Sequence, residues 1–343
     1  MIGVEFLEGQ GLGNRLFCYI SAKCIAEDLG LPFGTAGREY LGADFLDMDL
    51  GEEITDVSGL SRYDEKEERI YLRDSVHDAV HGCYIAGADP VLTEAAKSRD
   101  FNNKNQDNIM LYGNLQSEEY FRNHRDEIRE WLRVKPEIDS AEYKAYTADD
   151  LCILNVRGGE YADKNELFLE KKYWKDAMKI MRDVNPAMRF MIVTDDVDAA
   201  SRLLPGIEVH HFGTAGDYCA IKNAEYLIVS NSSFAFFPAY TSTVLRRVIA
   251  PKYWARHNVS DGYWASEQNI YDGFEYLDRN GRLYDAAACR AELAEYRRTK
   301  LPEKQALVPL TAGSREALAL GKKYERERLL KKAVAKIGRT FTK

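Results

Sequence analysis

The chain has 343 residues, of which 45% are hydrophobic and 30% are charged. These proportions are typical of a globular protein with a full core, and they exclude a disordered, collagen-like or coiled-coil chain. The net charge of −8 argues against a general nucleic-acid binder, and the length suggests two domains, since a domain commonly holds about 100–200 residues.

The first 150 residues give an uneven pattern. Alternating apolar residues predict a strand over residues 2–6, and a glycine-rich turn over residues 8–14 leads into a helix over about residues 15–29. Residues 38–110 are rich in Asp, Glu and Gly without sustained periodicity, so we expect irregular segments with short helices. An amphipathic helix is predicted over residues 117–133.

From residue 150 on, apolar strands alternate regularly with helices. This alternation predicts right-handed βαβ units and a parallel sheet. Ligands of such sheets bind at the carboxyl ends of the strands, which here lie just after Val156, Val193 and Val229. The predicted strands are residues 152–156, 189–194, 207–212, 226–230 and 247–250, the last of the sheet, and the predicted helices are residues 171–184, 196–204, 216–224 and 233–244.

The turn over residues 9–15 (GQGLGNR) lies between a strand and a helix. Glycines there let a ligand approach the backbone N–H groups at a helix N-terminus. The spacing of Gly9, Gly11 and Gly13 departs from the dinucleotide fingerprint, so the turn is a weak dinucleotide site. A strand-to-helix turn without a ligand is the alternative interpretation.

Arg157 directly follows a predicted buried strand and precedes two glycines. A guanidinium there can bind a phosphate bidentately without crowding from neighbouring side chains. The alternative is a surface arginine in a turn.

Two further strand ends carry polar residues. Asp195 and Asp196 are adjacent carboxylates that could hold a metal or bind a sugar or a base, although Thr194 or Asp195 could equally cap the next helix. Magnesium would need further converging carboxylates, which the sequence does not indicate. Residues 231–234 (NSSF) favour an anion site at a helix N-terminus, and capping by Ser232 or Ser233 is compatible with that role.

Taken in order, six segments resemble motifs of the bacterial α-1,2-fucosyltransferase family and its relatives, the protein O-fucosyltransferases and the α-1,6-fucosyltransferases. The match spans about residues 3–285. Six motifs in register make a chance resemblance improbable. The segments are residues 11–19 (GLGNRLFCY), 115–121 (LQSEEYF), 155–161 (NVRGGEY), 194–196 (TDD), 231–237 (NSSFAFF) and 248–254 (VIAPKYW).

The sequence also departs from the family pattern. Asn155 stands where the family has His, Gly158 where it has a second Arg, and Glu160 where it has Asp. Two phenylalanines, at positions 236 and 237, replace a pair of tryptophans. The first arginine, Arg157, is retained, and protein O-fucosyltransferases also have a single arginine in this motif. The changes cluster where the donor sugar lies, so they bear on its identity.

The resemblance implies a GT-B-type α/β fold, in which two Rossmann-like domains face a cleft. We expect an acceptor-side domain over residues 1–148, a nucleotide-sugar-binding domain over residues 149–285, and a C-terminal helical extension over residues 286–343. The implied activity is an inverting, metal-independent transfer of L-fucose from GDP-fucose to a glycan hydroxyl, such as the 2-OH of a galactoside. The alternatives are a transferase of the same fold with another nucleotide sugar, and a non-catalytic glycan-binding or scaffold protein.

The resemblance also implies roles for single residues. Arg157 would neutralise the β-phosphate of the leaving GDP, and Asp217 would accept hydrogen bonds from guanine. Glu160 is the better candidate for a general base, since Asn14 lies near the reaction centre in relatives but an amide is no base. The expected donor-binding residues are Gly11, Gly13, Asn14, Arg157, Asp195, Asp196, Asp217, Asn231, Ser232, Ser233 and Phe234. No metal or bound cofactor is expected.

The remaining features concern compartment and membrane. Six cysteines without a C-x-x-C motif favour reduced, buried thiols over three disulfides, and we expect a cytoplasmic protein without a membrane span. Residues 315–343 hold ten Lys or Arg against three Asp or Glu. We expect helices over residues 291–298 and 316–337, separated by two prolines. The last helix either packs back on the N-terminal domain or attaches peripherally to an anionic membrane.

Overall fold

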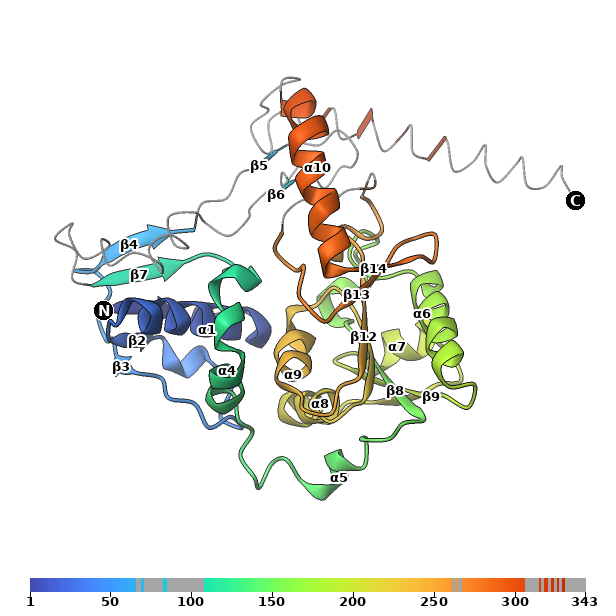
Figure 1. The fold of residues 1–343 in the computed structure, drawn as a ribbon, viewed down its shortest axis with the longest axis horizontal. Coiled ribbons are helices and arrows are strands. Elements are labelled where there is room, and N and C mark those ends of the chain that lie inside the picture. The colour runs from blue at the N-terminus through green and yellow to red at the C-terminus, as the bar shows by residue number, and fades with distance from the viewer. Residues whose placement is uncertain are drawn as a thin grey trace, which may run out of the picture.

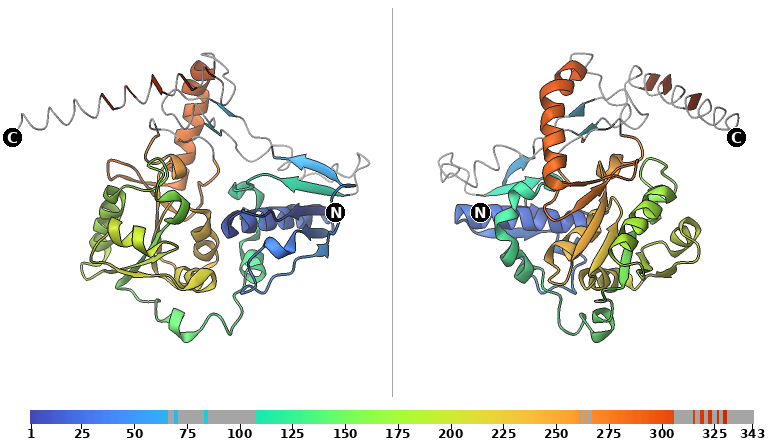
Figure 2. Two further views of the ribbon diagram at one scale, coloured as in Figure 1. Left: turned by 180° about the vertical axis from the view of Figure 1, so that it is seen from behind. Right: turned by 45° about the vertical axis from the view of Figure 1, so that its right-hand side comes forward.

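The computed structural model describes residues 1–65, 69–70, 83–84, 108–260, 262, 264, 267–305 and single positions between 315 and 330. Within these residues the chain forms two larger β-sheets, which are parallel except for one edge strand, and a two-stranded antiparallel sheet. Helices flank both larger sheets (Figure 1). The two α/β units lie side by side, with α1 and α9 in contact across their boundary (Figure 2). The expected GT-B-type architecture is confirmed.

The N-terminal sheet consists of short strands that all pair in parallel. The helix α1 (Leu12–Leu29) follows the first strand and is buried along most of its length. From one edge to the other the strands are β3 (Glu52–Glu53), β2 (Phe33–Ala36), β1 (Ile2–Glu5), β7 (Ile109–Tyr112) and β4 (Ser61–Asp64).

The sequence predicts irregular segments with short helices over residues 38–110, but the structure also places strands in this region. Their strands β3 and β4 are too short to display an alternating pattern, and they form because they pair with strands that are distant in sequence. The segment also contains a short 3₁₀ helix, η1 (Arg38–Tyr40), and an antiparallel pair, β5 (Arg69–Ile70) with β6 (Cys83–Tyr84).

The predicted helix over residues 117–133 is broken into three pieces, η3 (Glu118–Tyr120), η4 (Arg122–His124) and α4 (Arg125–Trp131). The break falls at Phe121, whose φ of −142° is not helical. Its ring is buried against Phe17 of α1, at 6.0 Å between ring centroids. Burial of this ring replaces a continuous helix with short turns.

The C-terminal sheet follows the regular pattern that the sequence predicts. Its strands are β10 (Glu208–His210), β9 (Arg189–Thr194), β8 (Leu151–Val156), β11 (Tyr226–Val229), β12 (Arg247–Pro251), β13 (Glu275–Leu277) and β14 (Leu283–Asp285), in that spatial order. The connecting helices are α6 (Lys171–Val184), α7 (Val197–Leu203), α8 (Gly213–Lys222) and α9 (Phe236–Thr241), with the 3₁₀ turns η5 (Gly159–Tyr161), η6 (Ser233–Ala235) and η7 (Trp254–Arg256). The short helix α5 (Ala141–Lys144) lies in the connection between the sheets (Figure 1).

Two predictions at the end of this domain are wrong. The strand over residues 247–250 is not the last, because β13 and the antiparallel β14 extend the sheet, and each is only three residues long. The helix predicted over residues 291–298 is α10 (Ala286–Gln305), which continues through Pro302 rather than ending before it. The helix predicted over residues 316–337 lies largely outside the described residues.

An aromatic cluster joins the two domains. Phe17 of α1 lies 4.8 Å from Phe236 and 4.7 Å from Phe237 between ring centroids, and both α9 rings are fully buried. Tyr271 packs against the rings of Phe17 and Phe236. The two phenylalanines that replace the tryptophan pair of the family therefore form the core of the domain interface.

The structure describes the side chains of five of the six cysteines. The side chains of Cys18, Cys24, Cys152, Cys219 and Cys289 are buried and free, as expected of thiols; the sixth, Cys83, lies outside the described side chains. Among the described helices, none has both the length and the apolar character needed to cross a membrane.

Candidate active site

The site begins where α1 meets η6 across the domain boundary. Gly11 is the N-cap of α1, no side chain caps the helix, and its first turn contains no acidic residue. A Cβ on Gly13 would lie 2.4 Å from the carbonyl carbon of Ser233, so only glycine permits this approach of two backbones. The resemblance implies that Gly13 binds the donor. In the structure Gly13 allows α1 and η6 to come into close contact across the domain boundary.

Asn14 connects three of the sequence motifs. Its Oδ1 accepts hydrogen bonds from Gln116 Nε2 at 2.9 Å and from Ser233 Oγ at 2.6 Å. These partners come from segments 102 and 219 residues away along the chain. The two donors together fix Oδ1 and with it the orientation of the Asn14 side-chain amide.

Arg157 lies at the carboxyl end of β8, half-buried, and forms an ion pair through Nη1 with Oδ2 of Asp195 at the end of β9. Its Nη2 is 3.8 Å from Oε1 of Glu160. The guanidinium carbon lies 5.6 Å from the ring centroid of Tyr161. The other oxygen of Asp195 accepts from the backbone N–H of Gly158 at 2.8 Å, so Asp195 fixes both the arginine and the loop that follows it.

Asp196 is a structural residue. Its Oδ1 accepts from the backbone N–H of Ala199 at 2.9 Å, which makes Asp196, rather than Thr194 or Asp195, the N-cap of α7. Its Oδ2 accepts from the N–H of Gly159 at 3.1 Å. In the described part of the chain no group of three or more His, Cys, Asp or Glu has a geometry that could hold a metal ion.

The loop leaves no room for a second arginine. A Cβ on Gly158 would lie 2.3 Å from the Cβ of Asp196. Any side chain at position 158 would therefore displace the cap of α7. The local packing therefore accommodates only glycine at position 158, where the motif that the sequence resembles has a second arginine.

Arg157 and Asp195 line a pocket between the domains, whereas Gly13, Asn14 and Asp196 do not. The pocket collects five of the predicted donor-binding residues, together with His211 and Thr214, which the sequence analysis missed. Both residues follow β10. Because ligands of parallel sheets bind at the carboxyl ends of the strands, the end of this strand would also have indicated them. The lining residues are Leu12, Asn155, Val156, Arg157, Asp195, His211, Thr214, Asp217, Ser232 and Phe234.

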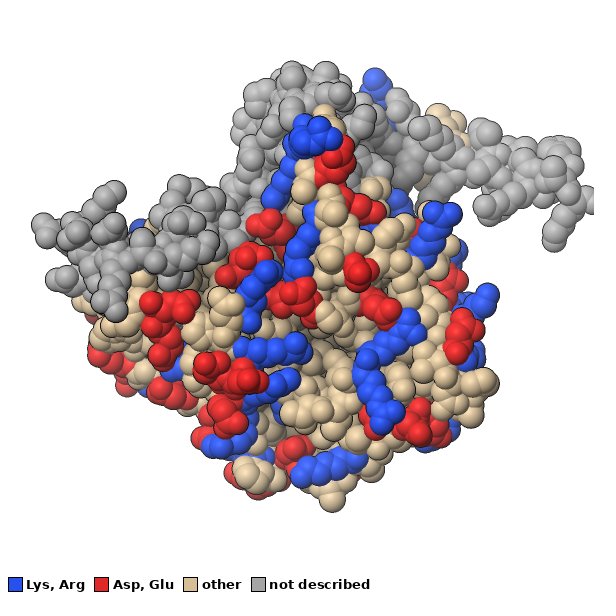
Figure 3. Space-filling model, viewed as in Figure 1, with Lys and Arg blue, Asp and Glu red and all other residues tan. Residues whose placement is uncertain are grey.

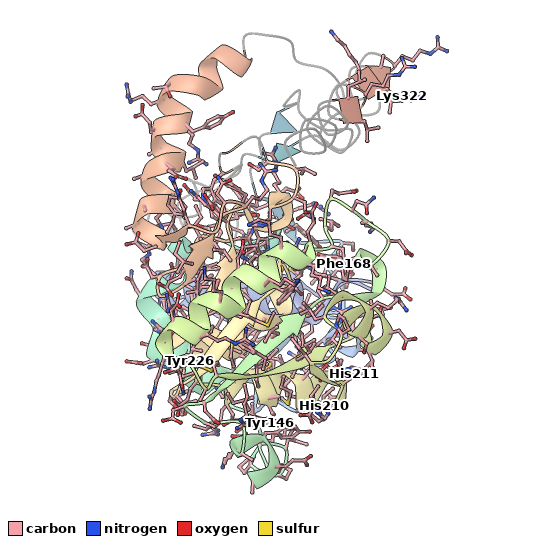
Figure 4. The ribbon with its side chains drawn as sticks, turned by 90° about the vertical axis from the view of Figure 1, so that its right-hand side faces the viewer. Tyr146, Phe168, His210, His211, Tyr226 and Lys322 are labelled. Carbon is pink, nitrogen blue, oxygen red and sulfur yellow. The ribbon has the colours of Figure 1, made fainter. Side chains whose placement is uncertain are left out.

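Asp217 and His211 form a pair in the wall of the pocket. Asp217 is buried, and its oxygens accept from the N–H of Phe212 and from Nδ1 of His211, each at 2.8 Å. Burial raises the pKa of Asp217, while these two hydrogen bonds act in the opposite direction. His211 and the adjacent His210 lie above Tyr146 on the same side of the domain (Figure 4), and the ring of Phe212 packs against both His210 and Tyr146.

The predicted anion-binding residues have defined partners. The Oγ of Ser232 accepts from the N–H of Phe234 at 3.3 Å and caps η6, while the hydroxyl of Ser233 donates to Asn14. Asn231 donates to the carbonyl of Leu167 at 2.9 Å and does not line the pocket. Glu160 lies on η5 outside the pocket lining, with a side chain 65% exposed.

A second pocket lies between the 115–121 segment and α10. Three arginines line it, and each is paired with a carboxylate: Arg122 with Glu119, Arg290 with Glu118, and Arg297 with Glu267. Figure 3 shows basic and acidic side chains interspersed over this face of the molecule. The balance of charge in this pocket does not favour an anionic ligand.

Comparisons with known proteins give structural neighbours only. No protein-family model matches the sequence, and no curated protein matches it. POFUT1 in complex with GDP-fucose is similar with a TM-score of 0.46 at 9% identity, over 73% of this chain and 97% of that one. NodZ α-1,6-fucosyltransferase co-crystallised with GDP has a TM-score of 0.42 at 15% identity, over 82% and 97%. The fucosyltransferase NodZ from Bradyrhizobium has a TM-score of 0.42 at 17% identity, over 73% and 94%. Because these values are low, the functional argument rests on the residues of this chain.

Proposed function

We propose that this chain is a glycosyltransferase that transfers L-fucose from GDP-fucose to a hydroxyl of a glycan acceptor. One observation carries the proposal. Motif residues that are far apart in sequence meet at the domain boundary, where Asn14 joins Gln116 to Ser233. Two further motif residues, Arg157 and Asp195, pair in the pocket between the domains. A random match of short motifs would not place their polar side chains in contact with one another.

Arg157 has the chemistry to assist departure of GDP. In the proposed reaction the acceptor hydroxyl attacks the anomeric carbon in line, and negative charge develops on the β-phosphate. A guanidinium held in place by Asp195 stabilises that charge without having to reorganise, and the uncapped N-terminus of α1 adds backbone N–H groups on the opposite side of the pocket. This arrangement requires no metal.

Asp217 is the proposed contact to the guanine base. Each of its oxygens accepts one hydrogen bond and retains a lone pair, so both can accept from the base N1–H and N2–H. His211 donates to Oδ2 from its side of the pocket and so orients the carboxylate toward the ligand.

Glu160 remains the candidate for the general base. It lies one 3₁₀ turn from Arg157, and its exposed carboxylate can reach an acceptor that enters from solvent. The 2-OH of a galactoside is the proposed nucleophile, by resemblance to the family.

Nucleotide release in the presence of different donors tests the proposal. The protein is incubated with GDP-fucose, GDP-mannose and UDP sugars, and thermal shifts are recorded with GDP and UDP. We expect hydrolysis or transfer with GDP-fucose and stabilisation by GDP only. Turnover with another donor would identify a transferase of different specificity, the alternative that the changes at Asn155, Gly158 and Glu160 leave open. No stabilisation by any nucleotide would refute a nucleotide-sugar site.

We propose in addition that the basic tail holds the protein at an anionic membrane surface. Among the described tail positions, Arg315, Lys322, Lys323 and Arg326 are exposed, and the side chains of Leu329 and Leu330 are also exposed, at 56% and 65%. Each basic residue near such a surface contributes about 1 kcal/mol. The intact chain should float with anionic vesicles and be released by high salt, whereas a chain ending near Thr311 should not float. Equal flotation of the intact and the shortened chain would show that the tail does not hold the protein at the membrane.

A further inference from the structure

A buried carboxylate that belongs to none of the motifs lies against the loop that precedes Gln116. Glu65 follows β4 and is 6% exposed. Its Oε2 accepts from the backbone N–H groups of Asn114 and Leu115, each at 3.0 Å. Its Oε1 accepts from the hydroxyl of Tyr120 at 2.8 Å and from Nε2 of Gln268 at 3.2 Å. Gln268 belongs to the C-terminal half of the chain, so this carboxylate also joins the two halves.

The loop around Glu65 adopts an unusual backbone conformation. Leu115 has a φ of +49°, in the left-handed region that residues other than glycine rarely occupy. Glu65 holds its N–H, and the hydroxyl of Ser21 donates to its carbonyl at 2.8 Å. Gly113 has a φ of +153°, and a Cβ there would lie 2.5 Å from the Cβ of Glu65. The loop is therefore shaped around this one side chain.

The strained residue immediately precedes Gln116. The amide of Gln116 donates to Asn14, and together with Ser233 it determines which way the Asn14 amide faces. A continuous path of contacts thus runs from Glu65 through Leu115 and Gln116 to Asn14.

We propose that Glu65 is a positioning residue, which fixes through Leu115 and Gln116 the orientation of the Asn14 side-chain amide. The catalytic consequence rests on the proposed function, whereas the orientation of Asn14 does not. A carboxylate accepts hydrogen bonds at both oxygens, whereas a glutamine presents NH₂ at one of them. Glu65→Gln therefore removes the negative charge that strengthens the hydrogen bonds from the N–H groups of Asn114 and Leu115, and it replaces one acceptor oxygen with a donor.

Kinetics of matched variants test the proposal. A displacement of about 1 Å at a reacting centre can lower a rate by roughly 10²-fold. We expect Glu65→Gln to lower kcat roughly 10–100-fold while the KM for the donor changes little. Gln116→Ala should do the same without disturbing the buried carboxylate, so the test survives if Glu65→Gln does not fold. Gln268→Ala is the control, because it removes one donor to Glu65 but leaves Leu115 held.

A double-mutant cycle with Asn14 separates positioning from general destabilisation. If Glu65 acts through Asn14, then Glu65→Gln should have no further effect on kcat in an Asn14→Ala background. Gln116→Ala should behave in the same way. Multiplicative effects in both cycles would overturn the proposal, since two independent losses multiply.

A measurement without substrate distinguishes this inference from the proposed function. The side-chain amide resonances of Asn14 in the free protein should shift in Glu65→Gln and Gln116→Ala, and remain in place in Gln268→Ala. Unchanged resonances in the first two variants would overturn the positioning role. A wild-type protein without turnover would count against the proposed function alone, because the resonances report on the free protein.

Discussion

The two domains contribute to the cleft in different ways. The C-terminal sheet supplies charged side chains at its strand ends, Arg157 and Asp195 after β8 and β9, and Asp217 in α8. The N-terminal domain supplies shape through helix α1, by the close backbone approach at Gly13 and the amide of Asn14. The comparison shows that a bilobal site can divide its work, with electrostatics on one side and close backbone contact on the other.

The same contrast holds for what stabilises each domain near the site. The C-terminal strands β8 and β9 are six residues long, and their pairing carries Arg157 and Asp195 to the same edge. The N-terminal loop over residues 113–120 is instead held by individual side chains, chiefly the carboxylate of Glu65 and the hydroxyl of Ser21. A regular sheet positions residues by its geometry, whereas an irregular loop depends on individual hydrogen bonds.

Removing the charge from the C-terminal side gives the largest expected effect. Arg157→Ala should fold normally, because the side chain is one third exposed, and should lower kcat/KM roughly 10²–10³-fold through loss of leaving-group stabilisation. Steady-state kinetics with the donor measure the loss. The matched control is Arg189→Ala, which removes an ion pair with Asp150 at the other end of β9. Near wild-type turnover of a folded Arg157→Ala protein would eliminate the proposed mechanism.

The second-largest effect is expected from a substitution that disrupts the close backbone contact on the N-terminal side. Gly13→Ala places a methyl group against the Ser233 backbone, so α1 and η6 must separate, with an expected cost of about 1–3 kcal/mol in unfolding free energy and a loss of GDP affinity. Gly11→Ala is the control, since no atom lies within 4 Å of its added methyl group. Urea denaturation and GDP titration measure both. Equal stability of the two variants would mean that the close approach is dispensable.

A pH titration sharpens the assignment of the base contact to the C-terminal domain. Guanine must bind the ionised form of Asp217, and burial raises the pKa of that carboxyl. GDP affinity should therefore fall as the pH is lowered through this raised pKa, beginning at a higher pH than for an exposed aspartate, and by at most about tenfold per pH unit. Calorimetric titration with GDP records the profile. Asp217→Asn should bind GDP more weakly at neutral pH, and the fall in GDP affinity caused by protonation of Asp217 should be absent. An identical pH profile of GDP affinity in both proteins would show that Asp217 does not contact the guanine base.

Chelation gives the smallest expected effect. If Arg157 and the α1 N-terminus neutralise the pyrophosphate, treatment with EDTA should leave turnover unchanged. Complete loss of activity that Mg²⁺ or Mn²⁺ restores would transfer Asp195 and Asp196 from fixing the Arg157 loop to binding a metal, and the division between the domains would have to be redrawn.

The sequence by itself determined the C-terminal domain almost element by element. Long apolar strands alternate there with helices, and this periodicity is local, so it predicts both the parallel sheet and the strand-end positions of Arg157 and Asp195. It also predicted the turn after β1, although α1 begins at Leu12 and so includes Gly13, which the sequence placed in the turn. The elements it missed, β13 and β14, are three residues long and carry too little pattern to be recognised.

Only the tertiary structure decided which residues act on which. The contacts of Asn14 with Ser233 and of Gly13 with the Ser233 backbone span about two hundred residues, and no local pattern encodes them. The role of Glu65 was hidden for the same reason, since its partners lie 49 to 203 residues away. Periodicity records which face of an element is buried, whereas the partner on that face is chosen by the packing of the whole chain.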